Sequence, residues 1–291
     1  MVYQNILNAI GRTPLVKIQK LNPYLGVEIF AKLEGNNPGG SVKDRVAKYL
    51  IEEAEKRGQL GHQKIILEAT SGNTGIGLAM IAAFKGYRFT AVMSEDTSPE
   101  RQKLLQLYGA KIVLTDPKRG TDGAIIKANK LLERDRSYIM LDQYNNLANI
   151  LAHFETTGKE IINDLPEVDV FVAGMGTGGT LMGVGRRLKE FNPKIKIVGV
   201  EPNIKNGIPG LRNMNNYRPF VFEGKNLDLK IRVSKKEAML MMQKLFSIEG
   251  ISAGISSGAA MYGALKVARL VKKGKVVVLF PDRGDRYLSL W

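Results

Sequence analysis

A short segment around Lys43 combines residue types that could form a covalent bond with a carbonyl compound. Residues 35–40 are Gly, Asn and Pro, which favour turns, and apolar residues at helical spacing follow from Val42 onwards. Ser41 and Asp44 fit a capping box, so we expect a helix to begin at Ser41 with Lys43 in its first turn. The helix dipole disfavours a protonated lysine there by ~0.3–1 kcal/mol, which favours the neutral amine that attacks a carbonyl.

Three further loops carry groups that could bind an anion or a small ligand. Residues 70–75 (Thr-Ser-Gly-Asn-Thr-Gly) join a predicted strand to a predicted helix, and their hydroxyl, amide and backbone N–H groups suit a carboxylate or a phosphate. Residues 174–180 (Gly-Met-Gly-Thr-Gly-Gly-Thr) follow an apolar strand and open a helix, which favours binding of a single phosphate. Residues 254–258 (Gly-Ile-Ser-Ser-Gly) place Ser256 at a helix start, where its hydroxyl either caps the helix or contacts a ligand.

Two of these loops also match motifs of other enzyme classes. The glycines of residues 174–179 fit G-x-G-x-x-G, and Glu201 follows at a suitable distance, so an NAD-dependent oxidoreductase is an alternative. The loop lacks the Gly-Lys-Ser/Thr ending of an NTPase P-loop. Residues 254–258 fit the G-x-S-x-G motif of serine hydrolases, but that fold needs a histidine after the serine. Both histidines of this chain precede Ser256, which excludes such a hydrolase.

A regular alternation of strands and helices must position these loops. Parallel strands covered by helices explain such an alternation, so the sequence predicts an α/β fold in which ligands bind at the carboxyl ends of strands. Residues 201–229, rich in Asn, Gly and Pro, are expected to be irregular. The predicted strands are 65–67, 89–93, 111–114, 138–141, 168–173, 195–200 and 275–280; the predicted helices are 75–85, 98–108, 122–134, one ending near 165, one ending at 191, 234–247 and 257–272.

The composition is that of a globular protein with a large core. The chain has 291 residues and no cysteine, which excludes disulfides, a thiolate nucleophile and a cysteine-ligated metal. His62 and His153 lie far apart, form no metal-spacing motif and are predicted to be structural or surface residues. Without an apolar signal core or a membrane-length apolar run, we expect a soluble cytoplasmic protein.

The chain is strongly basic, with a net charge of +15. A basic nucleic-acid-binding protein is therefore an alternative of a different class. The basic residues are dispersed along the sequence, however, so a solvated basic surface that attracts anionic substrates and cofactors is the preferred interpretation.

Together, a neutral lysine, a phosphate loop, an amide-and-hydroxyl loop and a lone serine suggest pyridoxal 5'-phosphate, which has an aldehyde, one phosphate, a ring hydroxyl and a pyridine nitrogen. Residues 37–45, 70–75, 176–180 and 256–258 resemble the fold-type-II pyridoxal-phosphate enzymes. The opening residues 5–15 resemble those of the cysteine synthases, and the closing residues 282–289 resemble the B type of that family. The resemblance covers nearly the whole chain.

The resemblance implies a role for each matching residue. Lys43 matches the Schiff-base lysine and proton shuttle, Asn73 the amide that bonds the ring hydroxyl, and Ser256 the serine facing the ring nitrogen. The phosphate loop corresponds to Gly176, Thr177, Gly178, Gly179 and Thr180. The clamp for the substrate carboxylate corresponds to Thr70, Ser71, Thr74 and Gln143.

The resemblance also implies an activity and an architecture. The expected reaction is PLP-dependent β-replacement, which converts O-acetylserine or O-phosphoserine and a sulfur donor such as sulfide or thiosulfate to cysteine or S-sulfocysteine. We expect two parallel-type sheet subdomains with helices on both faces: residues 1–45 and 147–291 holding the cofactor, and residues 46–146 forming a smaller mobile part. A homodimer without nucleic-acid or membrane partners is expected.

One position departs from the family pattern. B-type enzymes commonly carry two arginines after Ile-Pro-Gly, whereas this chain has only Arg212, followed by Asn213. Arg212 is therefore a candidate ligand for an anionic donor, and the departure leaves the acyl and sulfur donors open. A cystathionine β-synthase-like enzyme, acting on serine and homocysteine, is the alternative within the family.

Overall fold

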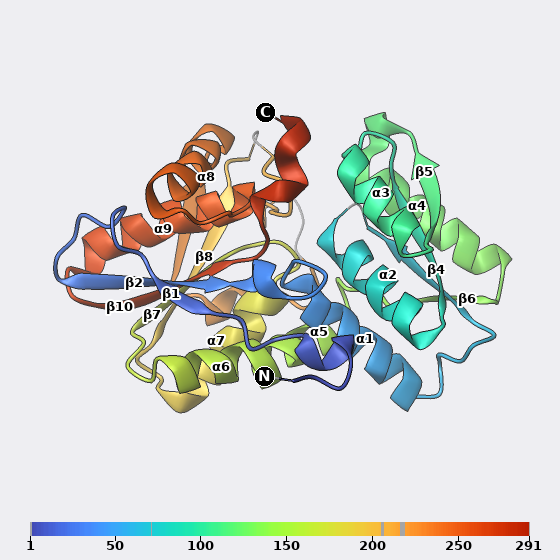
Figure 1. Ribbon diagram of the computed structural model, residues 1–291, viewed down its shortest axis with the longest axis horizontal. Coiled ribbons are helices and arrows are strands. Elements are labelled where there is room, and N and C mark those ends of the chain that lie inside the picture. The colour runs from blue at the N-terminus through green and yellow to red at the C-terminus, as the bar shows by residue number, and fades with distance from the viewer. Residues whose placement is uncertain (1, 71, 205–206, 216–218, 291) are drawn as a thin grey trace.

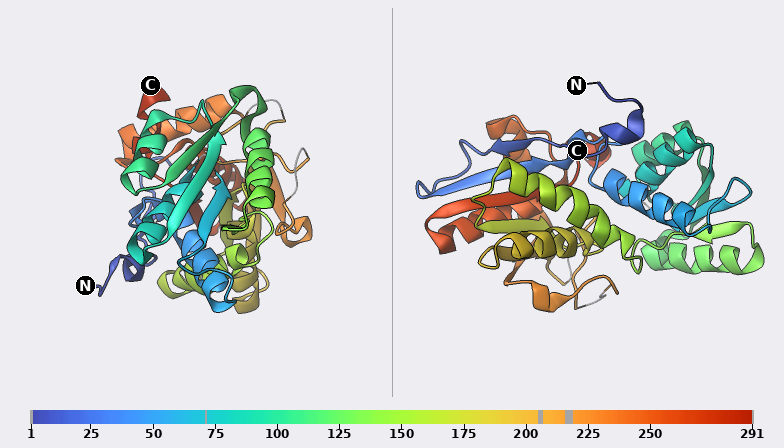
Figure 2. Two further views of the ribbon diagram at one scale, coloured as in Figure 1. Left: turned by 90° about the vertical axis from the view of Figure 1, so that its right-hand side faces the viewer. Right: turned by 90° about the horizontal axis from the view of Figure 1, so that it is seen from below.

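Two β-sheets flanked by helices make up the structure, a computed structural model that describes residues 2–70, 72–204, 207–215 and 219–290 (Figure 1). The larger sheet has the strand order β1-β2-β10-β7-β8-β9, and the smaller has the order β5-β4-β3-β6. The sheets occupy the two halves of an elongated molecule (Figures 1 and 2). Helices cover both faces of each sheet, which confirms the predicted fold class.

In the larger sheet all pairs are parallel except β1 with β2. Helices α8 and α9 pack on one face, and α6 and α7 pack on the other. The strands are β1 (Leu15–Lys17), β2 (Val27–Leu33), β7 (Val170–Gly174), β8 (Lys196–Pro202), β9 (Leu229–Val233) and β10 (Gly274–Phe280); the helices are α5 (Ala148–Ala152), α6 (Gly158–Asp164), α7 (Gly179–Phe191), α8 (Lys235–Glu249) and α9 (Ile255–Val271).

The smaller sheet is entirely parallel. Helices α1, α2 and α3 contribute to the core on one face, where Ile66 lies, and α4 covers the other, where Leu67 lies. The strands are β3 (Ile65–Ala69), β4 (Arg88–Ser94), β5 (Lys111–Thr115) and β6 (Tyr138–Met140); the helices are α1 (Lys43–Lys56), α2 (Asn73–Lys85), α3 (Pro99–Leu107) and α4 (Gly120–Arg134). Among the described helices, none has the length and apolar character that crossing a membrane requires.

Short helical turns join several of these elements, and one of them changes a prediction. The helix expected to end near residue 165 consists of α5, a π-helical turn η4 (His153–Thr157) and α6. The 3-10 turns are η1 (Ile6–Ala9), η2 (Glu34–Asn36), η3 (Pro117–Arg119), η5 (Gly224–Asn226) and η6 (Gly284–Leu290). The described residues between 203 and 228 have little regular structure, as expected, but the sequence did not predict β1, β2 or β9.

The helix that carries Lys43 begins two residues later than expected. Ser41 Oγ accepts a hydrogen bond from the Lys43 backbone N–H (3.2 Å), and the Asp44 N–H donates to the Ser41 carbonyl oxygen. The Asp44 carboxylate accepts from the Gly39 N–H (2.6 Å). The predicted capping box is therefore wrong, because Ser41 Oγ does not cap Asp44, but Lys43 does lie in the first turn of α1.

A buried ion-pair cluster fixes this first turn. Arg45 is 1% exposed, and its guanidinium contacts the carboxylates of Glu34 (2.7 Å) and Glu160 (2.6 Å). The buried ammonium of Lys32, in β2, lies 2.9 Å from Glu160. Although burial alone would raise it, the hydrogen bonds and charge of Arg45 lower the pKa of Glu160 to about 2. The cluster therefore joins α1 to β2, η2 and α6.

We predict that Arg45→Ala lowers the free energy of unfolding by about 3–5 kcal/mol, because it leaves the buried Glu34 carboxylate without its cation. Urea unfolding of the cofactor-free protein measures this change. Arg57→Ala is the control: Arg57, at the end of α1, is 60% exposed and pairs with Glu53 one turn away, so its loss costs about 0.5 kcal/mol or less. Equal, small losses in both variants would contradict the assigned role of Arg45.

Candidate active site

A cavity of about 840 Å³ lies between the two sheets, where β3, β7 and β10 end. Its size is within the range of small-molecule sites. The predicted residues that line it are Lys43, Thr70, Asn73, Thr74, Gln143, Gly176, Thr177, Gly178, Thr180, Arg212 and Ser256. Gly179 is buried beside them at the start of α7, and Ser71 lies outside the described residues.

Lys43 projects into this cavity from the first turn of α1. Its Nζ lies 3.4 Å from Thr177 Oγ1, which belongs to the glycine-rich loop of the larger sheet. Burial lowers the pKa of Lys43 to about 8. The sequence predicts that the helix dipole favours the neutral amine, whereas in the structure it is burial that lowers the pKa of Lys43. A substantial fraction of the amine is therefore neutral near physiological pH.

The loop after β7 forms a cradle that side chains would obstruct. Gly178 has a φ of +91°, which favours glycine. A Cβ atom on Gly176 would lie 2.6 Å from the Gly210 carbonyl oxygen, and one on Gly179 would lie 2.0 Å from Asn149 Oδ1. The loop leads into α7, whose first backbone N–H groups have no acceptor within the helix. These features suit close approach of an anion such as a phosphate.

His153, which the sequence assigned to structure or surface, lies behind this loop. It is fully buried, and its Nε2 lies 3.2 Å from Thr180 Oγ1, while its Nδ1 lies 3.0 Å from Thr157 Oγ1. Burial, followed by the charges of Lys43 and Arg45, holds the pKa of His153 well below its usual value. The neutral ring thus orients the Thr180 hydroxyl. Its position in a π-helical turn could not be predicted from sequence spacing.

Asn73, at the start of α2, is held by two residues that sequence reasoning did not assign to the site. Its Nδ2 donates to the Asp282 carboxylate (2.8 Å), and its Oδ1 accepts from the Arg286 guanidinium. Arg286 also donates to the Gly39 carbonyl oxygen, and Tyr287 donates to Asp282 (2.8 Å). The segment after β10 therefore fixes the amide of Asn73 and the loop that precedes Lys43.

Thr70 and Thr74, from the loop that precedes α2 and its first turn, lie with Gln143 in the lining of the cavity. Thr74 Oγ1 donates to Gln143 Oε1 (2.7 Å), and both side chains are 4% exposed. Thr70 Oγ1 accepts from the backbone N–H groups of Gly72 (3.4 Å) and Gly75 (3.2 Å), which stabilises the turn into α2. The hydroxyl, amide and N–H groups required for a carboxylate site are thus gathered at one end of the cavity.

Ser256 and Arg212 lie on the larger-sheet side of the cavity. Ser256 is in the first turn of α9 and is 4% exposed. The Arg212 guanidinium lies 4.9 Å from the ring centre of Tyr144 and donates to its hydroxyl (3.0 Å). Arg212 therefore rests on an aromatic face at the cavity wall.

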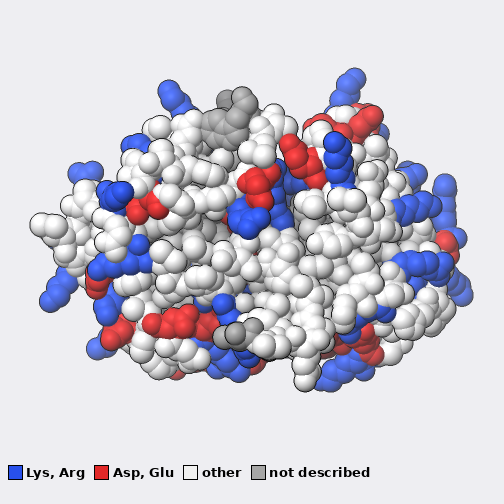
Figure 3. All heavy atoms as spheres, viewed as in Figure 1, with Lys and Arg blue, Asp and Glu red and all other residues white. Residues whose placement is uncertain are grey.

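Positive charge dominates the cavity lining. Six cationic side chains face two acidic ones: Lys43, Arg101, Lys118, Arg119, Arg212 and Lys235 against Asp122 and Asp282. This excess attracts anionic ligands. On the face seen in Figure 3, the Lys and Arg side chains are scattered rather than gathered in a stripe, which is typical of a solvated basic surface.

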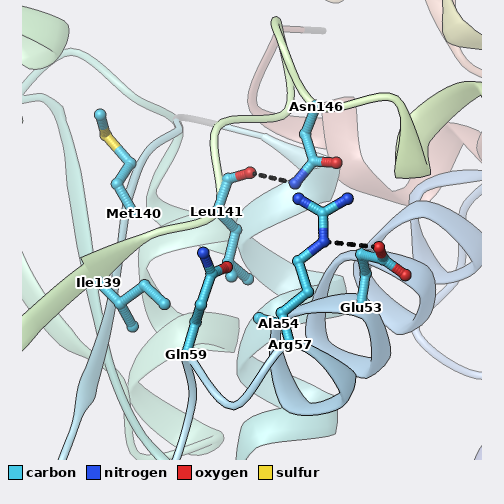
Figure 4. Close-up of a pocket in the computed structure, with 8 residues that line it drawn as sticks. All are labelled: Glu53, Ala54, Arg57, Gln59, Ile139, Met140, Leu141 and Asn146. Carbon is cyan, nitrogen blue, oxygen red and sulfur yellow. Dashed lines mark hydrogen bonds and ion pairs between the residues drawn. The ribbon is translucent and has the colours of Figure 1, made fainter.

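A second pocket of about 210 Å³ lies between the C-terminal part of α1 and β6 (Figure 4). Arg57 donates to Glu53 at its edge, and Asn146 Nδ2 donates to the Leu141 carbonyl oxygen (3.0 Å). None of the predicted site residues lines this pocket. In the described part of the chain, no cluster of His, Asp and Glu could hold a metal ion. We therefore assign the chemistry to the larger cavity.

Comparison with known proteins identifies the family of this chain. Residues 6–282 match the family described as pyridoxal-phosphate dependent enzymes. Cysteine synthase B of Salmonella typhimurium is 46% identical over 282 residues, covering 96% of this chain and 93% of the relative. Cysteine synthase of Aquifex aeolicus is 45% identical over 297 residues, covering 98% and 91%. A crystal structure of a hydrogen sulfide-producing enzyme from Fusobacterium nucleatum has a TM-score of 0.95 and 41% identity, covering 99% and 100%.

The chain therefore belongs to the pyridoxal-phosphate-dependent enzyme family, and it has the fold of the type-II members. Within the family it is a pyridoxal-phosphate-dependent transferase of the cysteine synthase type. The predicted cofactor is confirmed at the family level.

The cavity fits this cofactor and not the dinucleotide alternative. The glycines of residues 176–180 leave no room for side chains and allow an anion such as a phosphate to approach the backbone closely, and Lys43 supplies an amine with a lowered pKa beside them. Glu201, which a dinucleotide site would use, is fully buried, accepts from the Met214 N–H (3.1 Å) and pairs with Arg232 (3.3 Å). Glu201 does not line the cavity.

We predict that the rate at which the cofactor-free protein bonds covalently to pyridoxal phosphate rises with pH and levels off above about pH 8. The reason is that the amine reacts only when neutral, and burial lowers the pKa of Lys43 to about 8. Absorbance at the wavelength of the imine measures the rate. The reference is an α-blocked lysine in solution, whose rate rises until about pH 10. A matching rise to pH 10 in the protein would contradict the lowered pKa.

Proposed function

We propose that the protein forms cysteine by replacing the β-substituent of O-acetylserine or O-phosphoserine with sulfur from a donor such as sulfide or thiosulfate. Thiosulfate would give S-sulfocysteine. The observation that carries this proposal is that one cavity is lined by a lysine with a lowered pKa, by the glycine-rich loop after β7 and by hydroxyl and amide side chains that could bind a carboxylate. The similarity to enzymes named cysteine synthase supports the same reaction class. A cystathionine β-synthase-like reaction is the alternative within the family.

We assign the cofactor contacts to residues from both sheets. When bound, pyridoxal phosphate supplies an aldehyde that bonds covalently to an amine and a conjugated ring that accepts the electron pair of a C–H bond. Asn73 donates to the ring hydroxyl, and Ser256 contacts the ring nitrogen. A serine does not protonate that nitrogen as a carboxylic acid would, which favours elimination over transamination. The phosphate contacts are Gly176, Thr177, Gly178, Gly179 and Thr180.

Lys43 carries the proton transfers. Its neutral amine takes the proton from the α-carbon of the bound substrate as a general base. The bond between the β-carbon and the acetate or phosphate oxygen then breaks, and a bond to sulfur forms. Lys43 returns the proton to the α-carbon of the product. During these steps the substrate carboxylate binds Thr70, Ser71, Thr74 and Gln143, which fixes the orientation of the α-carbon.

Residues 46–146 are proposed to move as a smaller subdomain against residues 1–45 and 147–291. The smaller sheet has hydrophobic clusters of its own, separate from those of the larger sheet, which supports movement as a unit. Closure would bring Thr74 and Gln143 onto the substrate and exclude water from Lys43. Assembly as a homodimer and a cytoplasmic location stay predictions.

Arg212 is proposed to bind the anionic group of a donor. Its guanidinium lies on the cavity wall against Tyr144. A guanidinium forms charge-assisted hydrogen bonds with phosphate or thiosulfate, groups that sulfide lacks. One arginine at this place can contact one phosphate or thiosulfate group. The pair O-acetylserine and sulfide carries neither group and therefore does not need Arg212.

We predict that Lys43→Ala loses nearly all cysteine formation from O-acetylserine and sulfide, because no amine remains to bond the cofactor or carry the α-proton. The measurement is kcat of the cofactor-loaded protein. The control is Lys56→Ala, which removes an exposed lysine from the same helix and should keep the wild-type rate. A near wild-type rate in Lys43→Ala would refute the proposed function.

We predict that Arg212→Ala lowers kcat/KM roughly tenfold to a hundredfold with an anionic partner (O-phosphoserine or thiosulfate), as expected for a lost charge-assisted hydrogen bond of ~1.5–3 kcal/mol. The rate with O-acetylserine and sulfide should be unchanged. Arg186→Ala, at an exposed arginine of α7, is the control for loss of one positive charge. Equal losses on every donor pair would show that Arg212 is structural, and no loss on any pair would show that it contacts no donor.

A further inference from the structure

Glu68 has a buried carboxylate to which the proposed function assigns no role. It lies near the end of β3, is 2% exposed, and belongs to a strand whose neighbouring residues are apolar and buried. Burial raises the pKa of Glu68 to about 7, and the nearby charge of Asp142 adds to this effect. An apolar side chain would fill the same space without the cost of burying a carboxylate. The position therefore uses the hydrogen-bonding capacity of Glu68.

The carboxylate holds the backbone just beyond the end of β6. Pairing between β3 and β6 stops at Leu67 and Met140, one residue before Glu68. The chain then turns at Asp142, whose φ of +52° is unusual for a non-glycine residue. Glu68 accepts hydrogen bonds from the N–H groups of Asp142 (3.1 Å) and Gln143 (3.2 Å). Its two oxygens thus replace the backbone acceptors that a longer strand would have provided.

The segment that Glu68 holds is a compact turn. The Asp142 carbonyl oxygen accepts from the N–H groups of Asn145 (3.2 Å) and Asn146 (2.9 Å). The Asn146 side chain folds back over the end of β6 and donates to the Leu141 carbonyl oxygen, as Figure 4 shows. Because the turn is closed by its own bonds, a displacement at Asp142 would carry Gln143 with it.

Gln143 connects this turn to the rest of the cavity. Its Oε1 accepts from Thr74 Oγ1 (2.7 Å), and its carbonyl oxygen accepts from Asn149 Nδ2 (2.8 Å). Asn149 Nδ2 also donates to Thr177 Oγ1 (3.0 Å), next to Lys43. With Thr74 and Asn149 fixing the side chain and the carbonyl group, Glu68 fixes the remaining backbone N–H of Gln143.

We propose that Glu68 is a positioning residue of the active site, which holds the backbone of Gln143 so that its amide meets the carboxylate of the amino-acid substrate. This inference rests on the proposed function, which assigns Gln143 to the substrate carboxylate. Glu68 itself does not line the cavity and acts through Gln143. Its loss should therefore weaken ligands that carry an α-carboxylate and spare ligands that lack one.

The test is Glu68→Gln in the cofactor-loaded protein. Glutamine keeps the size of the side chain but offers one acceptor and an NH2 group, so one of the two backbone N–H groups faces a donor. The dissociation constants of L-methionine and of its decarboxylated analogue, 3-(methylthio)propylamine, are measured from the cofactor absorbance. We expect Glu68→Gln to weaken L-methionine roughly tenfold and to leave the amine unchanged.

Two matched variants sharpen this test. Glu133→Gln, at an exposed glutamate of α4, controls for loss of one negative charge from the same half of the molecule. In a Gln143→Ala background, Glu68→Gln should cause little further weakening of L-methionine, since a residue that acts through Gln143 has no effect once that side chain is gone.

The results of these measurements distinguish a failure of the positioning role of Glu68 from a failure of the proposed function. Equal weakening of both ligands, no change in either, loss of cofactor absorbance in Glu68→Gln, or full additivity with Gln143→Ala would overturn the positioning role. A wild-type protein that binds L-methionine no better than the amine would instead overturn the proposed carboxylate site, and the inference with it.

Discussion

The active-site geometry depends on the ion pairs that the buried guanidinium of Arg45 forms. Helix α1 packs against α2 of the smaller sheet, but its first turn is tied through Arg45 to Glu34 and Glu160, which belong to elements around the larger sheet. Lys43 lies two residues before Arg45 in that turn. Helix α1 thus contacts both halves of the molecule, and its ion pairs fix the position of the end that carries Lys43.

Buried ionisable groups lie at the cavity and behind its walls, although burying a charge costs free energy in a protein. Burial lowers the pKa of Lys43 to about 8 and raises the pKa of Asp44 and of Glu68 to about 7. Each shift records an unfavourable environment for the charged form. Asp44 and Glu68 both accept backbone N–H groups from the loops that border the cavity. The buried carboxylates of Asp44 and Glu68 therefore hold loops around the Lys43 amine, which must lose its proton before it reacts.

The sequence predicted the parts of this molecule that depend on local pattern. Strands buried on both faces, such as β7 and β10, are apolar runs, and a glycine-rich loop marks where β7 ends. Strands β2 and β9 were missed because charged residues interrupt their apolar pattern. Lys32 in β2 is fully buried, and its ammonium group pairs with Glu160, a residue distant in sequence.

Most of the residues that the motifs indicated line one cavity, but the motifs did not indicate the residues that support this lining. Asn73 could be chosen from its loop, whereas Arg286, which fixes its amide, lies 213 residues away. His153 and Glu68 carry no motif, and their roles follow only from what the fold brings beside them. The same holds for the pKa of Lys43: its neighbours in the chain suggest a helix dipole, but long-range packing provides the burial that lowers the pKa.

Lys43 is proposed as the reactive centre of this cavity. The most direct measurement is reduction of the pyridoxal-phosphate-loaded protein with borohydride, followed by mass spectrometry of its peptides, since reduction makes the bond between cofactor and amine permanent. We expect one pyridoxyl group per chain, on the peptide that contains Lys43. Labelling of another lysine, such as Lys235 at the cavity lining, or no labelling at all, would contradict it.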